Sequence, residues 1–171
     1  MTVDNRLDIP CVILAALSAQ VRGPVILNAQ AGGAYSACGL DSIDDALSGQ
    51  LGPLAGIHAA MRWAERLGCP TVVTAPVDTP FLPRDLVVRL TEAGAPAVAQ
   101  SLGRIHGVCG LWPVKDASGL EAFLESGQRK VETWVNSIGA RPVDFAAPER
   151  RDPFFNINTP RDAERAQESI G

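Results

Sequence analysis

The sequence predicts an α/β fold in which helices cover both faces of a mostly parallel β-sheet. Short apolar runs alternate with longer segments whose apolar residues recur at helical spacing, and this alternation is typical of β–α–β units. Proline and glycine stand at the ends of many of these segments, where they begin or end elements. The chain has 171 residues, 46% of them hydrophobic and 20% charged, which is enough for one packed core. We therefore expect residues 1–171 to form a single domain.

Helical spacing or helix-terminal residues mark several segments. The clearest apolar stripe runs from Leu54 to Leu67, and Gly68 after it is a suitable C-cap. Pro10 stands early in another segment, where its missing N–H does no harm. The expected helices are 10–19, 54–67, 83–93 with Asp85 in its first turn, 118–124 after a Ser118-x-x-Glu121 capping box, 131–138 before Gly139, and a last helix from Thr159-Pro160.

Short apolar runs between these helices predict the strands. Several run into polar residues, which places those residues near the ends of strands. The expected strands are 24–29, 71–75, 97–102, 108–112, 143–145 and 154–158.

Charge and composition exclude several classes of protein. The formal net charge is −4 and Lys and Arg do not cluster, so nucleic acid is not expected as the main partner. The apolar run 9–17 is too short to span a bilayer, and Asp4 and Asp8 are unlike the positive start of a signal peptide. The four cysteines form no C-x-x-C pair, which favours reduced thiols over disulfides or zinc. We expect a cytoplasmic protein.

Asp78 is the strongest candidate for a ligand-binding residue. It follows the strand expected at 71–75, and open α/β sheets bind their ligands beyond the carboxyl ends of such strands. Pro76 and Pro80 flank it on a stiff loop, since each proline fixes its own φ. Such a carboxylate could hold Mg²⁺ against a triphosphate, or it could merely cap the following helix.

Four further residues are candidates for nucleotide binding. Gly52 and Gly56 stand at the start of a helix, where the backbone can approach a ligand and the dipole favours an anion, although a simple turn would also need glycine. Asn28 ends an expected strand and could contact a ribose or a base, or only cap a turn. Asp45 could accept hydrogen bonds from guanine N1–H and N2–H, or could simply be solvated together with Asp44.

The last candidates lie in the second half of the chain. Asn156 and Asn158 alternate along an expected strand, so both amides would face the same side. His106 precedes Gly107 in a connection between strands, and His58 lies inside a helix. Neither histidine has zinc-ligand spacing, and no G-x-S-x-G elbow indicates acyl transfer.

In this order along the chain, these segments resemble the molybdenum cofactor guanylyltransferases. The resemblance covers most of the chain and is most specific in two motifs, Gly-Pro-Leu-Ala-Gly at 52–56 and Pro-Val-Asp-Thr-Pro-Phe-Leu-Pro at 76–83. It implies a Rossmann-like three-layer α/β/α nucleotidyltransferase domain. The implied reaction joins GMP from GTP to the terminal phosphate of molybdopterin and releases pyrophosphate.

The resemblance also implies roles for individual residues. Asp78 would bind magnesium and GTP, and His106, Asn156 and Asn158 would face the pterin acceptor. The nucleotide would be bound by Asn28, Asp45, Gly52, Gly56 and Asp78. The acceptor is already an anion, so no general base is required, and positioning with charge neutralisation would provide catalysis.

The start of the chain departs from the family pattern. Members of the family begin with a strand, a glycine-rich phosphate loop and a lysine, whereas Pro10 corresponds to a position after that lysine. We therefore expect little transfer by this chain as it stands, and an open sheet edge that invites dimerisation. The alternatives are a non-catalytic protein that binds the cofactor and a nucleotidyltransferase with another acceptor. A monomer or homodimer, and contact with molybdoenzymes, are compatible with each of these functions.

Overall fold

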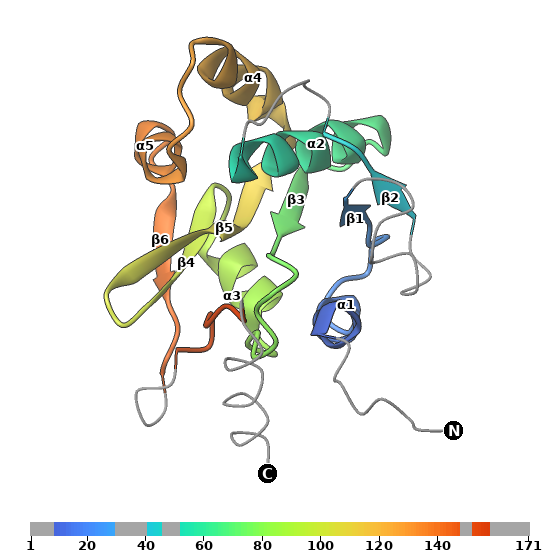
Figure 1. The fold of residues 1–171 in the computed structure, drawn as a ribbon, viewed down its shortest axis with the longest axis vertical. Helices are drawn as coiled ribbons and strands as arrows, with labels where there is room; N and C mark the ends of the chain where they lie inside the picture. Colours follow the sequence, from blue (N-terminus) through green and yellow to red (C-terminus); the bar gives the residue numbers. More distant parts are fainter. Residues whose placement is uncertain (1–8, 30–40, 46–51, 148–151, 158–171) are drawn as a thin grey trace.

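The structure, a computed structural model, describes residues 9–29, 41–45, 52–147 and 152–157 (Figure 1). None of the helices in these ranges is long and apolar enough to cross a bilayer. The helices are α1 (Ile9–Ser18), α2 (Pro53–Arg66), α3 (Leu86–Ala93), α4 (Ala117–Glu125) and α5 (Val131–Ser137), with a 3-10 turn η2 (Val114–Asp116) before α4. The strands are β1 (Leu27–Asn28), β2 (Ser42–Ile43), β3 (Thr71–Thr74), β4 (Ala97–Ser101), β5 (Arg104–Pro113) and β6 (Arg141–Asp144).

The strands of the described ranges form two separate sheets. One has four strands in the order β3-β5-β4-β6, and the other consists of the parallel pair β1 and β2. β3, β4 and β6 run in the same direction, whereas β5 is antiparallel to both of its neighbours. The reversal occurs at Leu102 and Gly103, whose φ angles of 49° and 76° are both positive, as a tight hairpin turn requires. The sheet is therefore mixed, within the expected α/β architecture.

Two apolar clusters cover opposite faces of the four-stranded sheet. Alternate residues of β4 point to different faces, so Ala97 and Ala99 belong to one cluster and Val98 to the other. The first cluster includes residues of α1 and α3, and the second includes residues of α2, α4 and α5. These contacts produce three layers, with the sheet in the middle (Figure 1).

Two expectations about element ends are wrong. α3 begins at Leu86, so Asp85 is its N-cap residue rather than part of its first turn, and its side chain makes no capping hydrogen bond. Ser118 lies inside α4 and does not cap it. Its hydroxyl is 3.4 Å from Arg62 of α2, which also binds the Glu121 carboxylate, so a tertiary partner replaces the capping box.

The late strand expected at 154–158 is also not found. Within the described part, residues 152–157 form a turn and extended backbone without strand pairing. Asn156 therefore does not belong to a strand, and the predicted alternation of Asn156 and Asn158 along one strand is not found. Asn158 and the expected last helix lie outside the described residues.

The two cysteines whose side chains the structure describes are free thiols, as expected. Cys69 is half-buried and Cys109 is buried in the first apolar cluster. Burial raises the pKa of the Cys109 thiol far above its ordinary value, so it stays protonated. Cys109 is thus a core residue without nucleophilic character.

Candidate functional site

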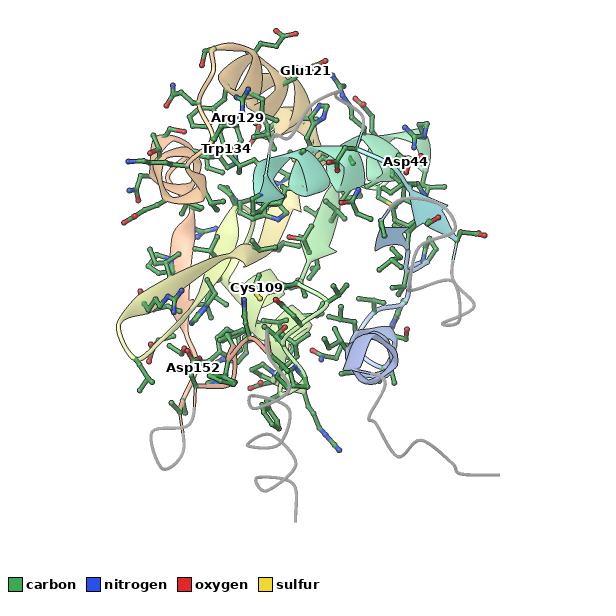
Figure 2. All side chains as sticks on the ribbon, in the orientation of Figure 1. Asp44, Cys109, Glu121, Arg129, Trp134 and Asp152 are labelled. Carbon is green, nitrogen blue, oxygen red and sulfur yellow. The ribbon has the colours of Figure 1, made fainter. Side chains whose placement is uncertain are left out.

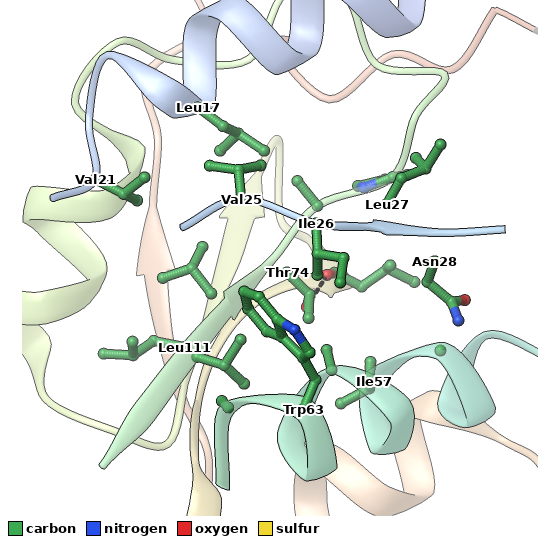
Figure 3. Close-up of a pocket in the computed structure, with 18 of the residues that line it drawn as sticks. Leu17, Val21, Val25, Ile26, Leu27, Asn28, Ile57, Trp63, Thr74 and Leu111 are labelled. Carbon is green, nitrogen blue, oxygen red and sulfur yellow. Dashed lines mark hydrogen bonds between the residues drawn. The ribbon is translucent and has the colours of Figure 1, made fainter. Parts of the chain in front are cut away.

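A groove of about 620 Å³ separates the two sheets, and it is lined by all five residues that the sequence singled out for nucleotide binding. Its sides are β1 with its preceding residues, β3, and α2, and residues of α1 also line it (Figure 3). Within the described residues, no strand pairing joins β1 to β3. The edges of the two sheets that border the groove are therefore not paired with each other in the described part of the chain, and the expected open sheet edge stays a prediction.

Asn28 and Asp45 form the polar corner of this groove. The Asn28 amide nitrogen donates to the Asp45 carboxylate and to the Ile43 carbonyl, each at 3.2 Å. Both side chains are exposed, so their remaining polar atoms are accessible to a ligand. Two strand ends thus bring together residues that lie seventeen positions apart in the chain.

Gly56 allows Asn28 to lie directly against α2. A Cβ atom at position 56 would come within 2.7 Å of the Asn28 amide oxygen. Real Cβ atoms do not show contacts this short, so a larger residue would displace the amide. The need for glycine here is one of close approach between a helix and a side chain.

The start of α2 presents backbone to the same groove. Gly52 has a φ of 70°, which favours glycine, and Pro53 occupies the first turn. The first turn carries no acidic residue, and the last turn carries Arg66. The partial positive charge of a fourteen-residue helix therefore faces the groove without a carboxylate of the helix to neutralise it.

Asp78 lies on the loop after β3 and lines the groove. Its Oδ1 atom is buried and has no hydrogen-bond partner among the described residues. Burial raises the pKa of the Asp78 carboxyl, and a backbone hydrogen bond partly opposes the rise. The buried Thr79 hydroxyl donates to the Pro76 carbonyl at 3.2 Å, which ties the loop to itself. Asp78 is thus held in a defined place with an unsatisfied oxygen.

The residues of this site fit a magnesium ion bound with a nucleotide rather than a metal held by protein ligands alone. No group of three or more His, Cys, Asp or Glu in the described ranges could hold a metal. Mg²⁺ is commonly bound through one or two carboxylates together with phosphate oxygens and water. The unsatisfied Asp78 oxygen meets that requirement, because a cation would contact a buried carboxylate oxygen that has no partner among the described residues.

The wall of the groove beyond these polar groups is apolar. Its lining includes Ile26, which directly precedes β1, and Ile57 and Trp63 of α2 (Figure 3). Thr74, at the end of β3, donates to the Val108 carbonyl at 2.6 Å and accepts from the Trp112 indole at 2.7 Å. Sequence reasoning did not single out Thr74 or Trp63, because their neighbours come from other elements.

His106 lies away from the groove, with its side chain 10% exposed. Its Nε2 atom is 2.7 Å from the Ser101 hydroxyl, which donates to Asp152 at 2.6 Å. The sequence analysis named neither Ser101 nor Asp152. The alternation of residues along β4 is the one sequence signal that could have placed Ser101 on the same side of the hairpin as His106. Burial lowers the pKa of His106, and the charge of Asp152 acts in the opposite direction.

Asn156 is exposed and makes no side-chain hydrogen bond to another described residue. The next residue, Ile157, donates its amide to the Asp78 carbonyl at 2.8 Å. The turn that carries Asn156 therefore touches the Asp78 loop. The roles of His106, Asn156 and Asn158 toward an acceptor stay predictions.

Comparison with known proteins gives a consistent result. The model of the MobA-like NTP transferase domain matches residues 10–141. A molybdenum cofactor guanylyltransferase of Acidiphilium cryptum is 46% identical over 156 residues, which are 90% of this chain and 77% of that protein. One of Cereibacter sphaeroides is 47% identical over 118 residues, which are 68% of this chain and 60% of the relative.

Among solved structures, the molybdopterin-guanine dinucleotide biosynthesis protein A of Archaeoglobus fulgidus is similar, with a TM-score of 0.62 and 24% identity. The match covers 93% of this chain and 85% of that one. At this identity the likeness concerns the fold, and it agrees with the layered α/β arrangement described above.

Proposed function

The chain belongs to the MobA-like NTP transferase family of nucleotidyltransferases, and from this premise we propose that it transfers GMP from GTP to molybdopterin. The product would be molybdopterin guanine dinucleotide. The observation that carries the proposal is the meeting of Asn28, Asp45, the start of α2 and Asp78 in one groove. Relatives 41% to 47% identical bear the name molybdenum cofactor guanylyltransferase, which supports this acceptor.

Asp45 is the residue that would distinguish guanine from adenine. Its carboxylate can accept two hydrogen bonds from the N1–H and N2–H groups of guanine, and adenine lacks this pair of donors. Asn28 donates to Asp45 Oδ1 and so orients the carboxylate before the base arrives. The exposure of both side chains leaves room for a base beside them.

The phosphates would lie between the start of α2 and Asp78. The backbone amides of the first helical turn and the helix dipole favour an anion. Asp78 would hold Mg²⁺, which neutralises negative charge on the phosphates when it is bound. The apolar wall around Ile57 and Trp63 would limit the access of water to the rest of the nucleotide.

The transfer itself needs little proton chemistry from the protein. An oxygen of the acceptor phosphate attacks the α-phosphorus of GTP, and the bond from that phosphorus to the β-phosphate oxygen breaks. Pyrophosphate leaves with the electron pair of the broken bond. Because the acceptor oxygen is already anionic, the residues of the groove have to bind and align the two substrates rather than remove a proton.

Base selection can be tested with two adjacent carboxylates. Asp45→Asn should weaken GTP binding about ten-fold or more and leave the weak binding of ATP unchanged, because a charged hydrogen-bond acceptor is lost. Asp44→Asn is the matched control. It removes the same charge from the neighbouring residue, whose side chain does not line the groove. Titration calorimetry with both nucleotides measures the effect. Equal losses for both variants would contradict the role of Asp45.

The role of Asp78 can be tested in the same titration with and without magnesium. Asp78→Asn should remove the magnesium dependence of GTP binding while the fold is kept. Asp85→Asn, an exposed carboxylate on the same connection, serves as the control. Unchanged magnesium dependence in Asp78→Asn would remove this residue from the site.

Turnover is measured as pyrophosphate release from GTP with molybdopterin. Release that needs both substrates and is lost in Asp78→Asn is the expected result. Magnesium-dependent GTP binding without any release would instead favour a homologue that binds its ligands without catalysis. Release with a different phosphorylated acceptor, but not with molybdopterin, would favour another nucleotidyltransferase.

A further inference from the structure

The segment 152–157 connects the β4–β5 hairpin to the loop that carries Asp78. At one end, the Asp152 carboxylate binds the hairpin through Ser101. At the other end, the Ile157 amide donates to the Asp78 carbonyl at 2.8 Å. In Figure 1 the segment lies beside α3 and the lower end of β6. The segment thus contacts both the hairpin and the backbone of the candidate metal ligand.

The hairpin end of this segment is a chain of hydrogen bonds centred on one oxygen atom. Asp152 Oδ1 accepts from the Ser101 hydroxyl at 2.6 Å and from the Phe154 amide at 2.9 Å. The Ser101 hydroxyl donates its hydrogen bond to Asp152, so its oxygen can accept a hydrogen bond from Nε2–H of His106 at 2.7 Å. Each donor in this chain therefore has an acceptor, and Asp152 Oδ1 is the last acceptor. We call Ser101, His106, Asp152 and Phe154 the Asp152 latch.

Burial makes the latch costly to open. Ser101 is fully buried, and the Phe154 ring, 3% exposed, stacks on His106 with 4.6 Å between ring centres. Phe154 also packs edge-on against Phe145 at 5.4 Å. If Asp152 were removed, a buried hydroxyl and a buried amide would lose their acceptor at the same time. The anchored segment is therefore held by both packing and polar contacts.

We propose that the Asp152 latch is a positioning device that holds the Asp78 loop, through Ile157, in the place where its carboxylate can serve the bound nucleotide. Asp152 and Ser101 are positioning residues, and neither lines the groove. The unsatisfied Asp78 oxygen gives such a device a purpose, because a half-buried carboxylate whose buried Oδ1 has no partner among the described residues favours movement of its loop into water. This functional consequence rests on the proposed function, whereas the latch itself does not.

The first test measures the latch without any ligand. Asp152→Ala should accelerate hydrogen exchange of the Ile157 amide by about ten-fold or more, because the loss of a charged acceptor frees the segment. Asp152→Asn keeps an oxygen that can accept from both donors, and should restore most of the protection. The amides of β3 and β5 serve as internal reference, so general destabilisation is recognised as a uniform change.

Ser126→Ala is the matched control. It removes a serine hydroxyl that follows α4 and donates at 2.7 Å to the Phe123 carbonyl. Glu121 of α4 and Asp152 lie at opposite ends of the view in Figure 2. This variant should leave exchange at Ile157 unchanged. Unchanged exchange at Ile157 in Asp152→Ala, or loss of protection in Asp152→Asn equal to that in Asp152→Ala, would overturn the latch.

The second test connects the latch to the metal ligand. Asp152→Ala should weaken magnesium-dependent GTP binding about ten-fold, and Asp152→Asn and Ser126→Ala should bind nearly as the wild type does. Faster exchange at Ile157 with unchanged affinity would overturn the positioning role. If the wild-type protein shows no magnesium-dependent GTP binding, the proposed function fails, and the exchange experiment still decides whether the latch holds the Asp78 loop.

Discussion

Replacement of Gly56 by alanine should separate the stability of this protein from its nucleotide affinity. Alanine is about 1 kcal/mol more favourable than glycine within a helix, and Gly56 lies in the first turns of α2. The new Cβ would stand 2.7 Å from the Asn28 amide oxygen, where ordinary contact begins at 3.4 Å, so the amide must move by about 0.7 Å. Asn28 is an exposed side chain and can rotate away.

The rotation has a calculable cost. It breaks the hydrogen bonds of Asn28 to Ile43 and to Asp45, each 3.2 Å long and exposed, which are worth about 0.5 kcal/mol apiece. Gain and loss nearly cancel, so the free energy of unfolding should change by less than about 1 kcal/mol. The displaced amide, however, no longer orients Asp45, and GTP affinity should fall about ten-fold.

Two measurements and one control decide this prediction. Urea unfolding gives the stability, and calorimetric titration with GTP and magnesium gives the affinity. Gly119→Ala places alanine in α4, where its Cβ would meet only Trp134 at 3.7 Å, so it should stabilise the protein and leave the affinity unchanged. Wild-type affinity in Gly56→Ala would refute the role of Asn28. A loss of more than about 2 kcal/mol in stability would refute the local nature of the clash.

Two further substitutions test the core and its response to pH. Gly110→Ala should destabilise the protein by about 3 kcal/mol, because the added Cβ would overlap the Trp112 ring and stand 3.0 Å from the Ala97 carbonyl, and an unchanged urea midpoint would contradict this packing. His58 is 1% exposed, and burial lowers its pKa, while Glu121 at 3.7 Å acts in the opposite direction. The unfolded chain then binds more protons than the folded one, so the free energy of unfolding should fall as the pH drops from about 7 to 5. Urea unfolding at the two pH values should show a smaller fall in His58→Gln than in the wild type. Identical falls in both proteins would exclude His58 as the cause.

Local sequence was sufficient where a pattern and its physical cause lie within a few residues. The start of α2 could be predicted from Gly52 and Pro53, because glycine accepts a positive φ and proline fixes its own φ without help from distant residues. The strand that became β3 and the placement of Asp78 after it were predicted for the same reason. Asn28, Asp45 and Asp78 do line one groove, while their roles in it stay predictions that rest on the family resemblance.

Tertiary contacts decided the features that the sequence mispredicted or missed. The capping-box pattern of Ser118 and Glu121 was present, but Arg62 of α2 binds both side chains, and a charged partner is a stronger one than a backbone amide. Ser101 and Asp152 stand 51 residues apart, and no feature of the neighbouring sequence indicates that Asp152 accepts a hydrogen bond from Ser101.

The sequence by itself therefore determined the segments that form α1 to α5, β1 and β3 to β6, and the polar residue at the end of β1, whereas β2 was not expected and the strand expected at 154–158 is not found. Only the tertiary structure decided the reversed direction of β5, the burial of an Asp78 oxygen that has no partner among the described residues, and the hydrogen bond from Ile157 to the Asp78 loop. The physical reason is range. Backbone preference and apolar spacing act over a few residues, whereas burial and hydrogen-bond partners depend on which distant segments pack together.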